Sequence, residues 1–211
     1  MAHPIMHLLI ADKIYSNKSS NIQSYGDFLL GSIAPDAVHE KENYTREIKD
    51  ISHYRFDKRS SFGHFDTFME AYATQENRDF VMGYLVHLLS DMIWYHAVRV
   101  PFKEAFMQAP SQRMSKNQAY YADCEQITQV LFEEKNVASI IEALNSSKAY
   151  TLESLIDAED VEAWRDRVVM EYQDRKKTVE DKQYITEKQI RDYIENCTQE
   201  CVDYLVNNYF R

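Results

Sequence analysis

One segment of this sequence, residues 77 to 98, is apolar on almost every side when it is drawn as a helix. A helix without a polar face is stable only when other elements cover it on all sides. The chain also has only four glycines and four prolines in 211 residues, which is little turn material for an all-β fold. The sequence therefore predicts an all-α fold, a multi-helix bundle around this buried central helix, and we expect Pro101 to end that helix.

Helical spacing of apolar residues predicts further helices at 4–15, 25–32, 62–73, 117–145 with a break near 135–136, 161–177 and 186–209. We expect a short helix over 151–157, with Thr151 at its start. Residues 37–61 are highly charged, which predicts an exposed loop with little regular structure. Because no repeat or long linker divides the chain, we expect residues 1–211 to form a single domain. Residues 1–100 would carry the functional site, and 101–211 would supply supporting helices.

The charge and the cysteines exclude several classes of protein. A net charge of −10 without a basic stripe makes nucleic acid an unsuitable partner. No apolar run reaches the roughly 18 residues of a transmembrane helix, and the N-terminal run has no basic leader. Three cysteines do not form a disulfide framework, so we expect Cys197 and Cys201 to be buried thiols. These features predict a cytoplasmic protein, and nothing in the sequence indicates its oligomeric state.

All seven histidines precede residue 97, and His87 lies four residues before Asp91 in the apolar helix. This spacing places both side chains on one face, a turn apart. Burying an aspartate costs several kcal/mol unless it is paired or bound to a cation. The alternatives are an arginine partner for Asp91 and a hydrogen-bonded core role for His87. A His/Asp pair among clustered histidines favours a metal site over both, and His96 could reach the rim of the same pocket.

Four further residues outside this helix are candidates for the same site. His7 lies in the first predicted helix, where a core histidine is the alternative. Asp36 follows Pro35 on a constrained loop, where an Asx turn is common. His53 and His64 lie among aromatic residues, and each could equally be a surface residue.

These elements occur in a recognisable order: a histidine in the first helix, Gly31-Ser-Ile-Ala-Pro-Asp36, Ser52-His53-Tyr54, and Gly83-Tyr-Leu-Val-His87-Leu-Leu-Ser-Asp91. Over about residues 3–100 the sequence resembles the zinc-dependent phospholipase C family of α-helical hydrolases, in its small intracellular bacterial branch. The resemblance implies a phospholipase C-like helical fold and a zinc site in a helical cleft.

Carried over position by position, the resemblance implies this set of metal ligands: His7, Asp36, His53, His87, Asp91 and His96. His64 competes with His53 for the mid-chain position, and Asp91 is the candidate bridge between two ions. Asp36 is also the candidate catalytic residue, orienting or deprotonating the attacking water. Because no histidine follows residue 96, we expect one or two zinc ions rather than three. Manganese or iron would also suit these donors.

The resulting hypothesis is a metal-dependent hydrolase of phosphodiester or phosphomonoester bonds, which uses a metal-activated water on a small or lipid-derived substrate. One alternative is a non-catalytic helical protein with a structural or sensory metal site. Another is a helical interaction module whose histidines only pack. We expect Tyr84 and Tyr95 to be packing residues and Arg99 to face solvent.

Overall fold

The structure is a computed structural model that describes residues 2–55, 65, 67–111, 113–175 and 184–210. Within these ranges the regular structure is helical, apart from one isolated bridge between Leu152 and Ile156. This confirms the all-α fold class. The elements are α1 (Pro4–Lys18), η1 (Ser19–Asn21), α2 (Tyr25–Gly31), η2 (Ala34–Glu40), α3 (Arg46–Ser52), α4 (Phe68–Tyr72), α5 (Arg78–Trp94), η4 (Tyr95–Arg99), α6 (Val100–Gln108), α7 (Lys116–Leu131), α8 (Val137–Asn145), α9 (Ala158–Gln173) and α10 (Glu187–Asn208).

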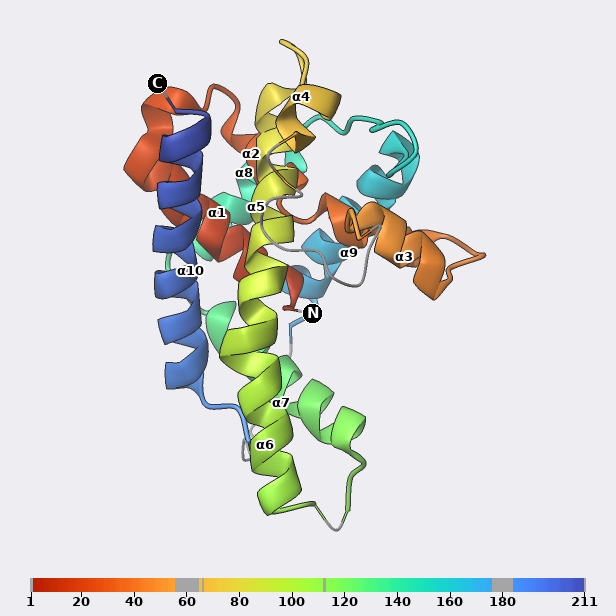
Figure 1. Ribbon diagram of the computed structural model, residues 1–211, viewed down its shortest axis with the longest axis vertical. Helices are drawn as coiled ribbons and strands as arrows, with labels where there is room; N and C mark the ends of the chain where they lie inside the picture. Colours follow the sequence, from red (N-terminus) through yellow and green to blue (C-terminus); the bar gives the residue numbers. More distant parts are fainter. Residues whose placement is uncertain (1, 56–64, 66, 112, 176–183, 211) are drawn as a thin grey trace.

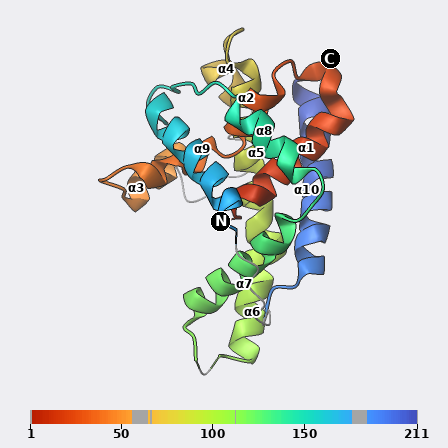
Figure 2. The same cartoon turned by 180° about the vertical axis from the view of Figure 1, so that it is seen from behind.

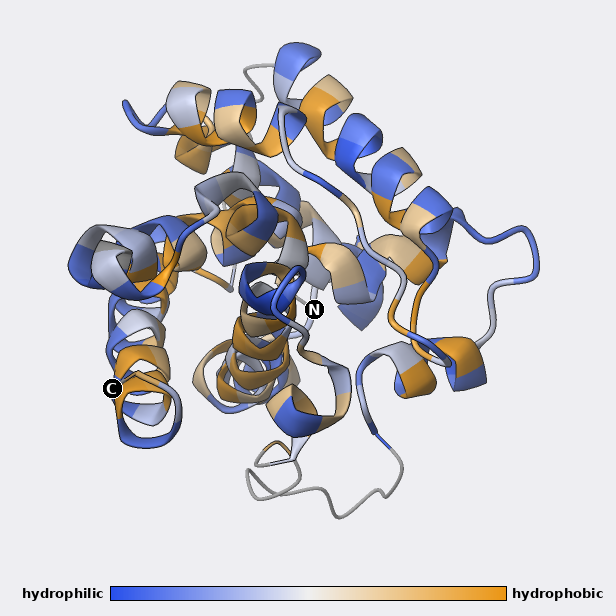
Figure 3. Ribbon diagram, turned by 90° about the horizontal axis from the view of Figure 1, so that it is seen from above, coloured by the Kyte–Doolittle hydropathy of each residue, from blue (hydrophilic) through white to orange (hydrophobic). Residues whose placement is uncertain are grey.

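Helix α5 is the central helix that the sequence predicts, and every residue from Asp79 to Asp91 is buried. It runs down the middle of the molecule, with α10 antiparallel beside it (Figure 1). Seen from behind, α1, α8 and α9 lie in front of α5 (Figure 2). In the view from above, the hydrophobic faces of the outer helices turn inwards and their hydrophilic faces turn outwards (Figure 3).

Helices α2 and α5 cross in direct backbone contact, and this crossing depends on two glycines. A Cβ atom added at Gly83 of α5 would lie 2.0 Å from the carbonyl oxygen of Phe28 in α2. One added at Gly31 of α2 would lie 2.0 Å from the carbonyl oxygen of Phe80 in α5. The two backbones therefore touch, which only glycine at both positions allows. This contact brings Ser32, the residue after α2, against α5.

The expectation that Pro101 ends the central helix is wrong. After Trp94 the chain continues through the π-helix η4 into α6, with Pro101 in the first turn of α6. Proline is tolerated there because its missing N–H is not needed in the first turn of a helix.

The prediction of an exposed, irregular loop over 37–61 is also wrong for its described part, residues 37–55. It contains most of η2 and all of α3. Thr45 caps the start of α3, where its hydroxyl accepts a hydrogen bond from the Ile48 amide at 3.2 Å. Lys49 and Ser52 of α3 are buried. Of the charged residues that suggest a loop, Arg46 and Glu47 lie on the exposed side of α3, whereas Lys49 lies on its buried side.

The other predicted helices differ from the structure mainly at their ends. The break within 117–145 is confirmed, since α7 ends at Leu131 and α8 begins at Val137. The helix expected over 151–157 is absent. An isolated bridge joins Leu152 and Ile156 there, and Thr151 Oγ1 accepts a hydrogen bond at 3.1 Å from the amide of Ala158, at the start of α9. Within the helix expected over 62–73, the structure has α4, which spans Phe68–Tyr72. Residues 62–64 and 66 lie outside the described part.

None of the described helices combines the length and the hydrophobicity that a membrane span requires. The prediction that Cys197 and Cys201 are buried thiols is confirmed, with a distance of 4.0 Å between their sulfur atoms. The assignment of residues 1–211 to one domain stays a prediction.

Candidate metal centre

Three imidazole rings and two carboxylates from different elements meet beside α5. His7 comes from α1, Asp36 from η2, His53 from the end of α3, and His87 and Asp91 from α5. All five are buried, with at most 6% of any one exposed. The structure thus brings together five of the six predicted ligands.

His53 lies in the middle of this group. Its Nε2 is 3.4 Å from Nε2 of His87, 3.4 Å from Oδ1 of Asp36 and 3.7 Å from Oδ2 of Asp91. At the edge of the group, His7 Nε2 lies 4.0 Å from Asp91 Oδ1, and His87 Nε2 lies 4.0 Å from Asp36 Oδ2. The rings of His7 and His87 stack, with centroids 4.0 Å apart. All three Nε2 atoms therefore face the two carboxylates.

Backbone carbonyls determine which ring nitrogen carries the proton in two of these histidines. His87 Nδ1 lies 2.8 Å from the carbonyl oxygen of Ser32, and His53 Nδ1 lies 3.0 Å from that of Lys49. A carbonyl oxygen can only accept, so both Nδ1 atoms donate and both Nε2 atoms keep a lone pair. Histidines that bind metals are oriented in this way.

A serine hydroxyl does the same for His7. Ser90 Oγ donates to the carbonyl oxygen of His87 at 2.9 Å, which uses its one proton. It must therefore accept from His7 Nδ1, which lies 2.8 Å away. The lone pair of His7 Nε2 is left facing Asp91.

The centre thus consists of acceptors that face one another. His7 Nε2 and Asp91 Oδ1 are buried and have no hydrogen-bond partner within the described part of the chain. Orphaned polar atoms of this kind are rare in folded proteins, because burying them unpaired costs free energy. A cation at the centre would satisfy them all. Two groups have ligand atoms within 4.8 Å of one another: His7, Asp36 and His87, and His53, His87 and Asp91.

The charge states of these side chains also suit a cation. Burial lowers the pKa of His7 to about 3 and that of His87 to about 4, and it lowers the pKa of His53 as well. Burial alone would raise the pKa values of Asp36 and Asp91, but the histidines around them hold both pKa values below the usual range. Neutral imidazoles and charged carboxylates are the forms that bind metal ions.

Two basic side chains that the sequence did not reveal complete the surroundings. Lys49 Nζ donates to Asp36 Oδ1 at 3.1 Å, and Arg55 Nη2 donates to Asp91 Oδ2 at 3.1 Å. The alternative of an arginine partner for Asp91 is thus realised for one carboxylate oxygen, whereas the other faces His7. The one available signal for Lys49 is its spacing of four residues before His53, which places the two on one side of α3.

The remaining candidate residues lie elsewhere. His96 is exposed on η4 and belongs to neither group of potential ligands, although it lines the same cleft as His53 and Asp91. His64 lies outside the described residues. Tyr84 is fully buried, and its hydroxyl donates to the carbonyl oxygen of Ser52, beside His53.

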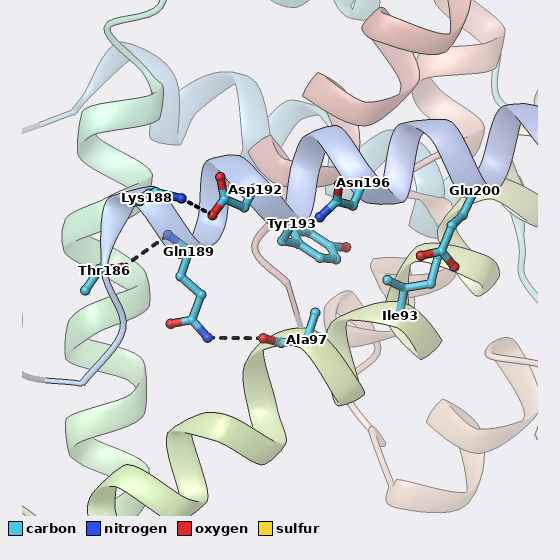
Figure 4. A pocket seen from close by; sticks show the side chains of 9 residues that line it. All are labelled: Ile93, Ala97, Thr186, Lys188, Gln189, Asp192, Tyr193, Asn196 and Glu200. Carbon is cyan, nitrogen blue, oxygen red and sulfur yellow. Dashed lines mark hydrogen bonds and ion pairs between the residues drawn. The ribbon is translucent and has the colours of Figure 1, made fainter.

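The centre forms part of the floor of a cleft of about 740 Å³. His53 and Asp91 line the cleft, whereas His7, Asp36 and His87 are not among its lining residues. A separate pocket of about 420 Å³ lies between η4 and α10 (Figure 4). In it Gln189 donates to the carbonyl oxygen of Ala97 and Lys188 pairs with Asp192, but it contains none of the six predicted ligands. The cleft beside His53 is therefore the candidate substrate site.

A helical fold that gathers three histidines and two aspartates beside a cleft, with His53 and Asp91 at the cleft floor, is the architecture of a helical metal-dependent hydrolase. The family model described as zinc dependent phospholipase C matches residues 6–209, so the chain belongs to this family. The match extends well beyond the segment 3–100 that carries the motifs. At the level of the family it supports a metal-dependent phosphoester hydrolase, with zinc as the metal of the family. Comparisons with curated proteins and with solved structures gave no match.

Proposed function

We propose that this chain hydrolyses phosphodiester bonds of lipid-derived substrates, with one divalent ion held by ligands drawn from the group His7, Asp36, His53, His87 and Asp91, so that a position stays open for water. The observation that carries the proposal is the convergence of two carboxylates with three Nε2 atoms, each of which the Nδ1 partner of its ring leaves as an acceptor. Zinc is the expected ion because it prefers nitrogen and carboxylate ligands. Manganese and iron are chemically suitable alternatives.

A single ion fits the centre better than two. Both groups of potential ligands contain His87, whose Nδ1 is occupied by the carbonyl oxygen of Ser32. Only Nε2 remains, and its one lone pair binds one ion. Lys49 and Arg55 already pair with Asp36 and Asp91, so a second divalent ion would leave a large excess of positive charge in a buried site.

The ion, when bound, lowers the pKa of a coordinated water towards about 7 and polarises a phosphoryl oxygen. Asp91 lies on the cleft floor and can accept a hydrogen bond from the attacking water, which orients it. Asp36 does not line the cleft and is held by Lys49, which suits a ligand better than a group that touches the water. The direct catalytic role of Asp36 stays a prediction.

In the hydrolysis itself, the water oxygen forms a new P–O bond while the P–O bond to the alcohol breaks. The proton that the water loses leaves through the open cleft to solvent, and the departing alkoxide takes a proton from solvent. The half-exposed Arg55 donates to Asp91, and it can redirect one of its N–H groups to a non-bridging phosphoryl oxygen of the substrate. Phe65, Leu88 and Met92 form an apolar wall of the cleft that suits the glyceride part of a lipid.

The test combines metal analysis with assays on protein without a histidine tag. Wild type is expected to bind about one equivalent of zinc and to hydrolyse bis-p-nitrophenyl phosphate faster than p-nitrophenyl phosphate. Asp91→Asn should lose both the ion and the activity. The matched control Asp192→Asn, which removes a surface carboxylate on α10, should keep both.

Three outcomes contradict parts of this proposal. Unchanged metal content and activity in Asp91→Asn would show that the site is wrongly assigned. A bound ion without turnover of either substrate would assign a structural or sensory site. Two equivalents of zinc would refute the single-ion centre.

A further inference from the structure

The cleft above the metal centre has two arms with different chemistry. The larger arm, of about 740 Å³, carries the apolar wall of Phe65, Leu88 and Met92. The smaller arm, of about 330 Å³, extends to Arg99. The two arms share four lining residues, Arg46, Arg55, Asp91 and Tyr95. A molecule whose phosphoester lies at Asp91 can therefore place one substituent in each arm.

The smaller arm is basic in a chain that is strongly acidic. Four of its ten lining residues are lysine or arginine: Arg46, Lys49, Arg55 and Arg99. Asp91, at its floor, is the only acidic residue among the described side chains that line it. The whole chain has 34 acidic residues and 24 basic ones, so this concentration of positive charge runs against the composition. Such a lining favours an anionic occupant.

Arg99 is the basic residue of this arm that the rest of the protein does not neutralise. Lys49, Arg55 and Arg46 pair with aspartates, whereas Arg99 forms no ion pair within the described ranges. Its guanidinium lies 3.9 Å from the centroid of the Tyr120 ring, and its Nη1 is buried without a hydrogen-bond partner. Arg99 is thus half-buried, and the expectation that it faces solvent does not hold for its Nη1 atom.

The surroundings of Arg99 hold its guanidinium in a defined plane. Trp94 Nε1 donates to the hydroxyl of Tyr120 at 2.7 Å, which fixes the ring on which Arg99 stacks. Trp94 itself is buried and lines the same arm. A planar guanidinium with unused donors and a fixed orientation is well suited to a phosphate or carboxylate.

From these observations we propose that the smaller arm is a subsite for a second anionic group of the substrate, with Arg99 as its main binding residue. The inference rests on the proposed function and names its substrate class. The preferred substrate is a phosphodiester with an apolar part on one side of the scissile phosphate and a second phosphate or carboxylate on the other. A cationic head group such as choline would be disfavoured in this arm.

The test uses a matched pair of short-chain substrates with zinc-loaded protein: dihexanoyl phosphatidylglycerol and its terminal phosphate ester. Wild type is expected to show a kcat/KM about tenfold or more higher for the phosphate ester, mainly through KM. Arg99→Gln should reduce this preference to less than about twofold, with a larger loss of kcat/KM for the phosphate ester than for phosphatidylglycerol. Arg99→Lys, which retains the charge, should keep part of the preference, and the surface control Arg191→Gln should keep all of it.

The same pair of compounds without acyl chains distinguishes the source of the anion. A preference that persists after deacylation supports a soluble phosphorylated substrate, and one that needs the acyl chains supports a lipid head group. Equal kcat/KM for both members of each pair in wild type would overturn the inference and leave the proposed function intact. So would a preference that survives in Arg99→Gln.

If neither compound is hydrolysed, the proposed function fails and a binding measurement decides the subsite. Inorganic phosphate is titrated into metal-free wild type and Arg99→Gln by calorimetry. Binding that weakens about tenfold in the variant would support the anion subsite. Equal affinities, or no binding to wild type, would overturn it. Thermal unfolding of each variant verifies that Arg99→Gln is folded.

Discussion

Ser90 offers a sharp test of how the centre is organised, because its hydroxyl is expected to act on the metal only through His7. In Ser90→Ala the Nδ1 proton of His7 loses its acceptor, which lies 2.8 Å away in wild type. The imidazole can then move its proton to Nε2, where Asp91 Oδ1 at 4.0 Å is the nearest carboxylate oxygen. In that tautomer Nε2 has no lone pair with which to bind the ion.

The expected loss of zinc affinity in Ser90→Ala follows from the kind of contact that is lost. Removing the group that orients a metal-binding histidine typically lowers metal affinity by about 10- to 100-fold, or about 1.4–2.7 kcal/mol. The assay is a zinc titration in competition with a chromophoric chelator near neutral pH. Circular dichroism verifies that the variant keeps its helices.

Ser32→Ala is the matched control, because Ser32 touches the centre through its backbone. Its carbonyl oxygen accepts from His87 Nδ1, whereas its hydroxyl donates to the carbonyl oxygen of Leu29 at 2.7 Å. The substitution leaves the backbone acceptor in place, so zinc affinity should not change. Wild-type zinc affinity in a folded Ser90→Ala protein would refute the reasoning, as would an equal loss in both variants.

Two further predictions concern stability. Gly83→Ala should destabilise the protein by about 3 kcal/mol or more, because the new Cβ would lie 2.0 Å from the carbonyl oxygen of Phe28. Chemical unfolding measures the free energy of unfolding, and the control Ser139→Ala, at an exposed position, should change that free energy by less than about 0.5 kcal/mol. Metal-free protein should lose stability as the pH falls from about 6.5 towards 4, because the unfolded chain takes up protons on His7 and His87 that the folded chain, with pKa values of about 3 and 4, does not. Each of these histidines contributes a slope of about 1.4 kcal/mol per pH unit, so the melting temperature of chelated protein should fall clearly across this range, and a flat profile would contradict the burial of neutral rings.

The sequence by itself determines the fold class and the central helix. A helix that is apolar on all sides is stable only inside a bundle, so the sequence of residues 77–98 predicts that other helices surround it. Helix spacing also places His87 and Asp91 on one face, and the order of the short motifs identifies the family. Helical periodicity reveals these features because it depends only on residues that are close together in the sequence. It fails where short helices have mostly charged outer faces, as in α3.

Only the tertiary structure decides which side chains from different elements meet. The crossing of α2 and α5 at Gly31 and Gly83 sets the carbonyl oxygen of Ser32 against His87. A backbone acceptor has no signature in the sequence, because every residue carries one. The tautomers of the histidines therefore depend on packing.

The same limit applies to the basic residues of the cleft. Arg55 and Arg99 resemble any surface arginine in the sequence, and the fold distinguishes them. Arg55 pairs with a carboxylate of the centre, whereas Arg99 stacks on Tyr120 with no acid beside it in the described structure. Whether a charge is neutralised depends on what lies across the cleft from it, and periodicity along one helix contains no information about that.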